Sequence, residues 1–332
     1  MQKRNFGRTG LQLGVLGFGC GAVGGLMVRG TPAEQERVVA RAIAAGVNYF
    51  DTAADYGTGE SEKTLGRVLR NLGNPDVVVG TKLRLLEPAR GRIADALAEG
   101  IEASLKRLGR DHVDLYQLHN PITAAGDGDT LSPATVLEEV VPALERLRDQ
   151  GKTRFIGITG IGDTPALREV VESERLDSAQ IPLNLLNPSP MALLPDGFPA
   201  HDFGQIMLRA QQANMGVIGI RALAGGALSG DAGRHPIAMP QVPPIGSSAT
   251  YEADLANARR FLPLVDEGHA GSLVEAALRF TISNNTMGTV LVGFSSEAHL
   301  EEAIAAVEKG ALSSKAMDRI SAIHDEIGRA HA

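Results

Sequence analysis

Four ionisable side chains of complementary types stand at the ends of three consecutive apolar runs in the first half of the chain. Asp51 ends the first run, and Tyr56 follows in the segment behind it. Lys82 comes just after the second run, and His119 comes just after the third. A carboxylate, a phenol, an ammonium group and an imidazole are the groups from which enzymes build acid–base catalysis.

These four groups suit a carbonyl that gains negative charge. A tyrosine has a pKa of about 10 and is a weak acid at neutral pH, but a lysine beside it lowers that pKa. We expect Tyr56 to exchange the proton, Lys82 to lower its pKa and Asp51 to keep Lys82 charged. His119 is expected to donate a hydrogen bond to the carbonyl oxygen. The set fits hydride reduction of a carbonyl or, in reverse, oxidation of an alcohol.

The elements around these residues follow a regular alternation of short apolar runs and longer helical patterns. The runs that we predict to be strands are Val15–Phe18, Asn48–Phe50, Val77–Gly80, Val113–Leu118, Phe155–Ile158, Ser178–Ile181, Val217–Ile220 and Thr289–Val292. Helix start signals lie between them, at Thr31 with Pro32 and Glu34, Ser132 with Pro133, Thr164 with Pro165, and Ser272 with Glu275. Strands that each precede a helical crossover predict a parallel (β/α)8 TIM barrel.

In such a barrel, chemistry gathers where strands end and the loops to the helices begin. Neighbouring strands lie about 4.8 Å apart, so we expect Asp51, Lys82, His119 and Tyr56 to meet. Each alone has an ordinary explanation, as a loop cap, a surface lysine, a buried histidine or a loop aromatic. Their arrival at one end of adjacent strands favours a shared active site.

Two segments fall outside the repeat. Residues 2–13 alternate around a turn at Gly7–Gly10, which predicts an N-terminal β-hairpin that closes the bottom of the barrel. Residues 221–271 are rich in Gly, Ala and Pro and are too long for a simple loop, so we expect a long functional loop at the C-terminal face. We expect residues 135–149 to form one helix with an apolar face. Residues 1–332 are then accounted for as a single domain.

A doubly wound dinucleotide-binding fold is the alternative, because Gly19, Gly21 and Gly24 spell G-x-G-x-x-G after a strand. In that motif a helix opens at the glycines and an acidic residue follows about 20 residues later. Here the next helix signal comes only at Thr31, and the next acid at a strand end is Asp51. We therefore favour the barrel.

Composition narrows the function classes. The 332 residues carry 32 basic and 39 acidic side chains, a net charge of −7, which offers no basic field to nucleic acid or a membrane surface. No stretch has the length of a membrane span. The single Cys20 cannot form an internal disulfide, and no Cys and His cluster has metal-binding spacing, so we expect a cytoplasmic protein without a metal.

The chain resembles the aldo-keto reductases over nearly its full length. The segments that carry the resemblance are Tyr49–Gly57, Gly59–Glu62, Leu65–Gly66, Thr81–Lys82, Asp114–His119 and Gly151–Gly157. The resemblance implies a catalytic tetrad of Asp51, Tyr56, Lys82 and His119 and a nicotinamide cofactor bound extended across the strand ends. It also implies that Gly19 and Gly21 line the cleft near the nicotinamide.

For the other cofactor residues, this chain matches the family at some positions and differs from it at others. Where the family has a serine and an asparagine at the nicotinamide amide, this chain has Thr159 and Gly160, and Gln180 matches the family's glutamine. Where the family has an aromatic residue that stacks on the nicotinamide, this chain has Ile220, followed by Arg221. Residues 225–228 keep the family's pattern. The cofactor residues that the resemblance implies in this stretch are Ile220, Arg221, Leu223, Gly225 and Leu228.

Barrels often bind phosphate after their last two strands, at a helix N-terminus. Here that junction is Gly293, Phe294 and Ser295, followed by His299 and Glu302. By resemblance a basic residue that grips the 2′-phosphate lies in this stretch, where only His299 is available, and Glu302 meets the adenine. Family frequency favours NADP(H), and NAD(H) stays open.

We therefore expect an NAD(P)-dependent aldehyde or ketone reductase, or a sugar dehydrogenase. Few aromatic residues occur, with 4 Tyr and no Trp, so small aldehydes, methylglyoxal-like carbonyls or sugar lactols are more plausible substrates than polycyclic ketones. The alternative is a nicotinamide-binding regulatory subunit of the same fold. Reaction direction and oligomeric state stay open.

Overall fold

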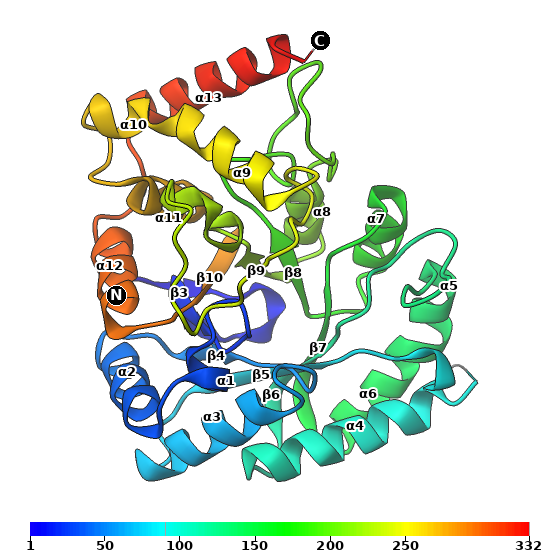
Figure 1. Ribbon diagram of the computed structural model, residues 1–332. Helices are drawn as coiled ribbons and strands as arrows, with labels where there is room; N and C mark the ends of the chain where they lie inside the picture. Colours follow the sequence, from blue (N-terminus) through cyan, green and yellow to red (C-terminus); the bar gives the residue numbers. More distant parts are fainter. Residues whose placement is uncertain (90, 332) are drawn as a thin grey trace.

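Eight parallel strands close into a barrel at the centre of the computed structural model, which describes residues 1–89 and 91–331 (Figure 1). Around the barrel the strand order is β10-β3-β4-β5-β6-β7-β8-β9. The strands are β3 (Leu16–Gly19), β4 (Tyr49–Asp51), β5 (Val78–Leu83), β6 (Val113–Leu118), β7 (Thr153–Thr159), β8 (Ser178–Pro182), β9 (Gly216–Ile220) and β10 (Met287–Gly293). The predicted (β/α)8 barrel is confirmed, and the doubly wound alternative is wrong.

Helices surround the barrel. They are α1 (Leu26–Arg29), α2 (Pro32–Ala44), α3 (Glu60–Asn71), α4 (Ile93–Leu108), α5 (Pro133–Thr135), α6 (Val141–Asp149), α7 (Thr164–Glu172), α8 (Ile206–Gln212), α9 (Tyr251–Ala258), α10 (Pro263–Asp266), α11 (Leu273–Ile282), α12 (Glu297–Glu308) and α13 (Ser314–Arg329). Thr31 forms the expected capping box with Glu34, and Ser132 and Ser272 accept hydrogen bonds from the backbone of their first turns. At α7 the cap position is Asp163, one residue earlier than predicted.

The predicted helix over residues 135–149 is interrupted. Residues Val136–Val140 form a π-helical turn, η3, and α6 continues from Val141. Pro142 has no N–H group and its ring crowds the carbonyl one turn back. The wider turn, in which the Val141 N–H bonds to the carbonyl of Val136, accommodates the proline without ending the helix.

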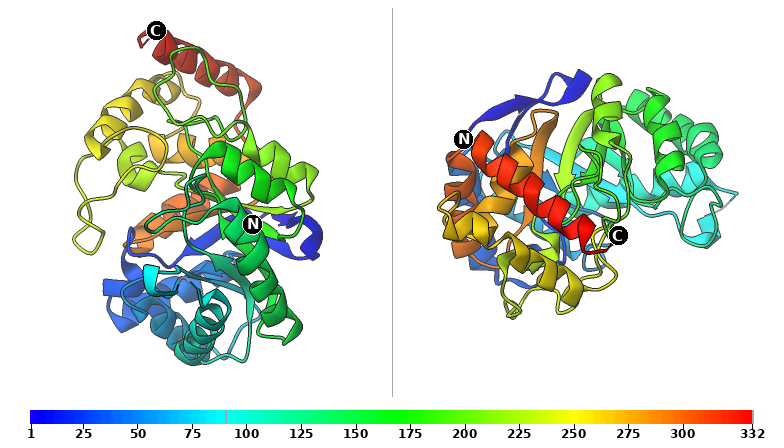
Figure 2. Two further views of the ribbon diagram at one scale, coloured as in Figure 1. Left: turned by 90° about the vertical axis from the view of Figure 1, so that its right-hand side faces the viewer. Right: turned by 90° about the horizontal axis from the view of Figure 1, so that it is seen from above.

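The predicted N-terminal hairpin, β1 (Lys3–Asn5) and β2 (Gln12–Gly14), is confirmed, with the short helix η1 (Gly7–Thr9) at its turn. It lies at the N-terminal ends of the strands (dark blue in Figure 2). Phe6 is buried, and a Cβ atom on Gly216 or Gly288 would lie within 2.8 Å of its ring. Arg4 donates to three backbone carbonyls between α11 and β10. The hairpin thus closes the bottom of the barrel.

The segment between β9 and β10 is more structured than the sequence predicts. Besides an extended stretch, it contains η4 (Ala224–Ser229), α9, η5 (Arg259–Phe261) and α10. Thr250 caps α9 by accepting a hydrogen bond from the backbone of Ala253. The last helix, α13, packs against η5 and α10 at the outer end of this segment (Figure 1).

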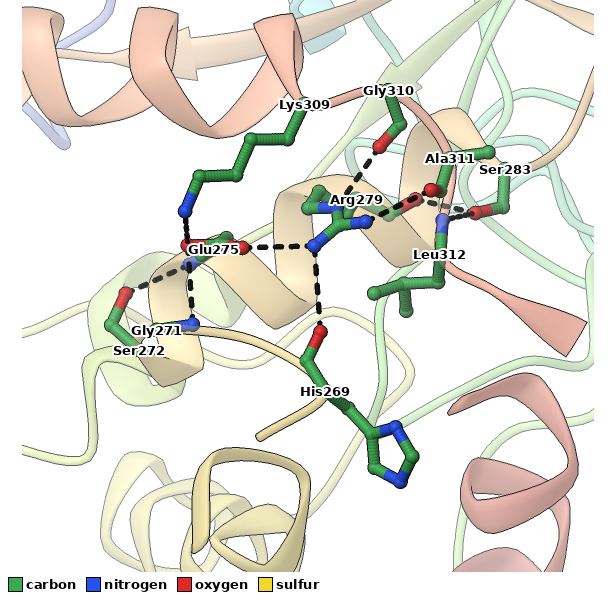
Figure 3. A network of polar contacts seen from close by, with 10 residues as sticks. All are labelled: His269, Gly271, Ser272, Glu275, Arg279, Ser283, Lys309, Gly310, Ala311 and Leu312. Carbon is green, nitrogen blue, oxygen red and sulfur yellow. Dashed lines mark hydrogen bonds and ion pairs between the residues drawn. The ribbon is translucent and has the colours of Figure 1, made fainter. Parts of the chain in front are cut away.

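A polar network fixes α11 to the C-terminal end of α12 (Figure 3). The carboxylate of Glu275 accepts hydrogen bonds from Lys309 Nζ at 2.6 Å and Arg279 Nη1 at 2.9 Å. The Gly271 backbone N–H donates to the same carboxylate at 3.2 Å. Burial by itself raises the pKa of Glu275, but these donors outweigh it and lower the pKa.

We predict that Glu275→Gln lowers the free energy of unfolding by about 1–3 kcal/mol at pH 7, because charged hydrogen bonds are lost. A carboxyl with a lowered folded-state pKa stabilises the fold above its unfolded pKa of about 4.3, and this contribution is lost as pH falls through the folded pKa. The difference from wild type should therefore vanish in acid. Denaturant unfolding in steps from pH 7 to about pH 2 measures it, with the exposed Glu308→Gln as control, expected within about 0.5 kcal/mol of wild type. An effect that keeps its size down to the lowest pH would contradict the ionic explanation.

Candidate active site

The C-terminal ends of β4 and β5 bring Asp51 and Lys82 into direct contact. Lys82 Nζ donates to Asp51 Oδ1 at 2.5 Å and to the Thr52 carbonyl at 2.7 Å. The other oxygen of Asp51 accepts from Tyr49 Oη at 2.9 Å and from Gln180 Nε2 at 2.6 Å. The Lys82 side chain is fully buried. Each member of the buried ion pair therefore forms further hydrogen bonds, Lys82 to a backbone carbonyl and Asp51 to two side-chain donors.

Tyr56 and His119 complete the cluster that the sequence predicts. Lys82 Nζ lies 4.9 Å from the centre of the Tyr56 ring. The rings of Tyr56 and His119 meet edge to face, with centres 5.7 Å apart. The structure thus brings all four predicted residues together at one end of the barrel.

The loop after β4 places Tyr56. It turns through left-handed backbone conformations at Gly57, Thr58 and Gly59 just before α3 begins. Ser61, in the first turn of α3, donates to the Cys20 carbonyl at 2.8 Å and shares a hydrogen bond with the Thr52 hydroxyl. These contacts tie the loop to the ends of β3 and β4.

Burial and charge set the protonation states of the cluster. Burial alone lowers the pKa of Lys82, but Asp51 outweighs it and the net pKa is raised, so Lys82 is charged at neutral pH. Burial raises the pKa of Tyr56; the charge of Lys82 lowers it as expected, but offsets burial only in part. Burial also lowers the pKa of His119. In the free protein, the phenol and the imidazole are therefore both neutral at pH 7.

A cavity of about 570 Å³ opens at these strand ends. Asp51, Tyr56 and His119 line it, while Lys82 lies beneath its wall. The predicted cofactor residues that line the cavity are Gly19, Gly21, Thr159, Gln180, Ile220, Arg221, Leu223, Gly225, Gly293, Ser295, His299 and Glu302. The three that lie behind its wall are Gly160, Leu228 and Phe294. Phe294 packs on Phe18 instead, and the Ser295 hydroxyl donates to the Gly24 carbonyl at 2.6 Å.

Two basic residues of this cavity, Arg234 and His235, are not predicted by the sequence. His299 was the only basic residue expected at the phosphate end, but Arg234 and His235 also line the cavity. The His235 and His299 rings lie 5.8 Å apart. Arg234 donates to the Gly225 carbonyl at 2.8 Å and to Tyr251 Oη at 3.1 Å. No local pattern marks these residues, because only the path of the long segment after β9 brings them to α12.

Arg221 directly follows Ile220, which stands where the resemblance would place an aromatic residue. Its backbone φ is 61°, a left-handed conformation that side chains other than glycine rarely adopt. Its guanidinium donates to the Pro243 carbonyl at 3.0 Å, and its own carbonyl accepts from Asn184 Nδ2 at 2.9 Å. Such strained positions concentrate at functional sites.

The residues present fit a nicotinamide dinucleotide. Thr159 Oγ1 is buried in the cavity wall and has no hydrogen-bond partner among the described residues, so a ligand amide can use it. Gly21 leaves room beside the Tyr56 ring, since a Cβ atom there would lie 3.3 Å from it. At Gly24 a Cβ atom would lie 2.4 Å from the backbone of Gly293. The glycine-rich wall therefore allows close approach of a long, flat ligand.

Within residues 1–89 and 91–331, no cluster of three or more His, Cys, Asp or Glu side chains is placed to bind a metal ion. Over the same residues, no helix combines the length and apolar character that crossing a membrane requires.

Comparisons with known proteins show the family of this chain. Residues 15–325 match the profile of the Aldo/keto reductase family. L-galactose dehydrogenase of Arabidopsis thaliana is 30% identical over 327 residues, covering 96% of this chain and 91% of that protein. A probable voltage-gated potassium channel subunit beta of the same plant is 25% identical over 320 residues, covering 93% and 92%. The solved holo form of aldo-keto reductase AKR11C1 from Bacillus halodurans shares the fold, with a TM-score of 0.72 at 23% identity over 97% of this chain and 96% of that one. The chain belongs to the aldo/keto reductase family.

Proposed function

We propose that this enzyme is an NAD(P)-dependent oxidoreductase that interconverts a carbonyl and an alcohol, and that residues 1–332 work as one barrel domain. The observation that carries the proposal is the buried Asp51–Lys82 pair directly beside Tyr56 at the cavity. A cationic side chain held against a phenol stabilises the phenolate that proton transfer leaves behind.

In the proposed reaction, Tyr56 exchanges the proton with the substrate oxygen. When bound, the nicotinamide supplies or accepts the hydride. The raised pKa of Tyr56 keeps its proton in place at neutral pH until the substrate oxygen gains charge. Lys82 then stabilises the phenolate, and Asp51 holds Lys82 in position. His119 lines the same part of the cavity and contacts the substrate.

We assign the cofactor to the same cavity. Thr159 and Gln180 would bind the carboxamide, with Gly19 and Gly21 beneath the nicotinamide. Arg234, His235 and His299 lie at the other end of the cavity. Burial and His235 lower the pKa of His299, so Arg234 is the group that carries positive charge for a phosphate there, and on this group we propose NADP(H) as the cofactor.

The substrates that we propose are small aldehydes or sugars. The cavity has few aromatic side chains for stacking on polycyclic ketones, with Tyr56 and Tyr251 in its lining. A full-length relative named as an L-galactose dehydrogenase supports a sugar. A cytoplasmic setting suits the single, buried Cys20. A regulatory subunit that binds nicotinamide is the second candidate, favoured by the likeness to a channel subunit beta.

We predict that Tyr56→Phe lowers kcat by about 10²–10⁴-fold, because the proton donor is lost, while binding of reduced cofactor is kept. Cofactor fluorescence titration and turnover of a panel of aldehydes and sugars measure the two effects. Tyr116→Phe is the matched control, since its hydroxyl bonds to the Leu97 carbonyl outside the cavity, and it should keep wild-type turnover. Cofactor binding without turnover of any panel member by wild type would favour the regulatory candidate.

We predict that Arg234→Gln raises the dissociation constant of NADPH about tenfold, through the loss of one charge-assisted contact. The dissociation constant of NADH should rise less than threefold if the contact is to the 2′-phosphate. Titration calorimetry with both cofactors measures this, with the exposed Arg260→Gln as a charge control. Equal weakening of both cofactors would place Arg234 away from the 2′-phosphate.

A further inference from the structure

A carboxylate outside the predicted tetrad faces His119. Asp55 stands directly before Tyr56 in the loop after β4, and its Oδ2 lies 3.3 Å from His119 Nδ1. Nδ1 is buried, whereas Asp55 is about half exposed. The two atoms lie within hydrogen-bond distance, but their geometry is not that of a formed hydrogen bond, and Nδ1 has no other partner among the described residues. Such contacts are often long in the free protein and tighten when a ligand binds.

The charged groups around this contact favour an ionised Asp55 and a neutral His119. Burial by itself raises the pKa of Asp55, but His119, Lys82 and Arg84 outweigh it and lower the net pKa. For His119, burial and the charges of Lys82 and Arg84 lower the pKa, and Asp55 opposes them only in part. Tyr56, the other titratable neighbour, is neutral.

The protonation states of Asp55 and His119 determine which ring nitrogen of His119 carries the proton. An ionised carboxylate can only accept hydrogen bonds, so the ring nitrogen that faces it must carry the proton. A neutral imidazole has one N–H, which leaves a lone pair on Nε2. His119 lines the cavity, and none of the described residues forms a hydrogen bond with Nε2. Nε2 therefore presents a hydrogen-bond acceptor to the cavity.

We propose that Asp55 is a positioning residue that holds His119 in the Nδ1–H tautomer, so that Nε2 accepts a hydrogen bond from a substrate hydroxyl. The proposal rests on the proposed carbonyl–alcohol chemistry, and it reverses the donor role that the sequence led us to expect for His119. Tyr56 then donates to the reacting oxygen while His119 accepts from a neighbouring hydroxyl. This division of roles selects hydroxyaldehydes and sugars over carbonyl compounds that lack a hydroxyl next to the reacting carbon.

Nitrogen-15 NMR of the free protein tests the tautomer without any turnover. The His119 resonances, assigned by their loss in His119→Gln, should show a protonated Nδ1 and an unprotonated Nε2 at pH 7. In Asp55→Ala, no acceptor faces Nδ1, so the preference for the Nδ1–H tautomer should be lost. Asp55→Glu should keep the wild-type pattern, because it keeps the carboxylate. An Nε2–H tautomer or an imidazolium in wild type would overturn the proposal.

A pair of substrates tests the consequence. Glycolaldehyde can donate a hydrogen bond from its hydroxyl, whereas methoxyacetaldehyde can only accept one. Wild type should favour glycolaldehyde in kcat/KM, and Asp55→Ala, which leaves no acceptor at Nδ1, should lower that preference about tenfold. The steric effect of the methyl group is common to all variants and cancels in this comparison. The control Asp127→Asn removes an exposed carboxylate from the loop after β6 and should keep the wild-type preference.

The two experiments separate the possible failures. If wild type turns over neither aldehyde with either cofactor, the proposed function is in doubt, while NMR still reports the tautomer. If Asp55→Ala changes neither the nitrogen resonances nor the substrate preference, Asp55 does not position His119 and the proposal is wrong.

Discussion

A buried ion pair in the mouth of the barrel is the interaction on which the site depends. Leaving a charged ammonium unpaired in a dry environment would cost several kcal/mol, so Lys82 can be fully buried only because Asp51 is beside it. Asp51 in turn accepts from Tyr49 and Gln180, which come from the same strand and from β8. The pair thus links strands across the barrel and fixes one positive charge beneath Tyr56.

The rest of the fold positions groups around that charge. Parallel strand ends place Asp51, Lys82 and His119 side by side, and the pinned loop after β4 carries both Tyr56 and Asp55 to the same spot. The hairpin closes the N-terminal end of the barrel, and the cavity opens at the other end, where the loops that follow the strands line it. The network around Glu275 holds α11 and α12 together.

The barrel and the residue types at its strand ends could be predicted from the sequence, because both follow from local patterns. Contacts between distant segments could not be predicted: Arg234 and His235 reach α12 only through the path of the long segment after β9. The π-helical turn before Pro142 arises from a balance between packing and a missing hydrogen bond that periodicity does not show. Asp55 stood inside the motif that carries the resemblance, but its contact with His119 depends on how the loop turns.

The pH dependence of alcohol oxidation in wild type and in the double variant Asp51→Asn/Lys82→Met tests the central claim most directly. The double variant removes both charges together, so that no unpaired ion stays buried. The account predicts that it still binds cofactor, and that the pH midpoint for oxidation, which requires the Tyr56 phenolate, rises by about 1–3 pH units. An unchanged midpoint and rate would show that the buried pair does not control the proton on Tyr56.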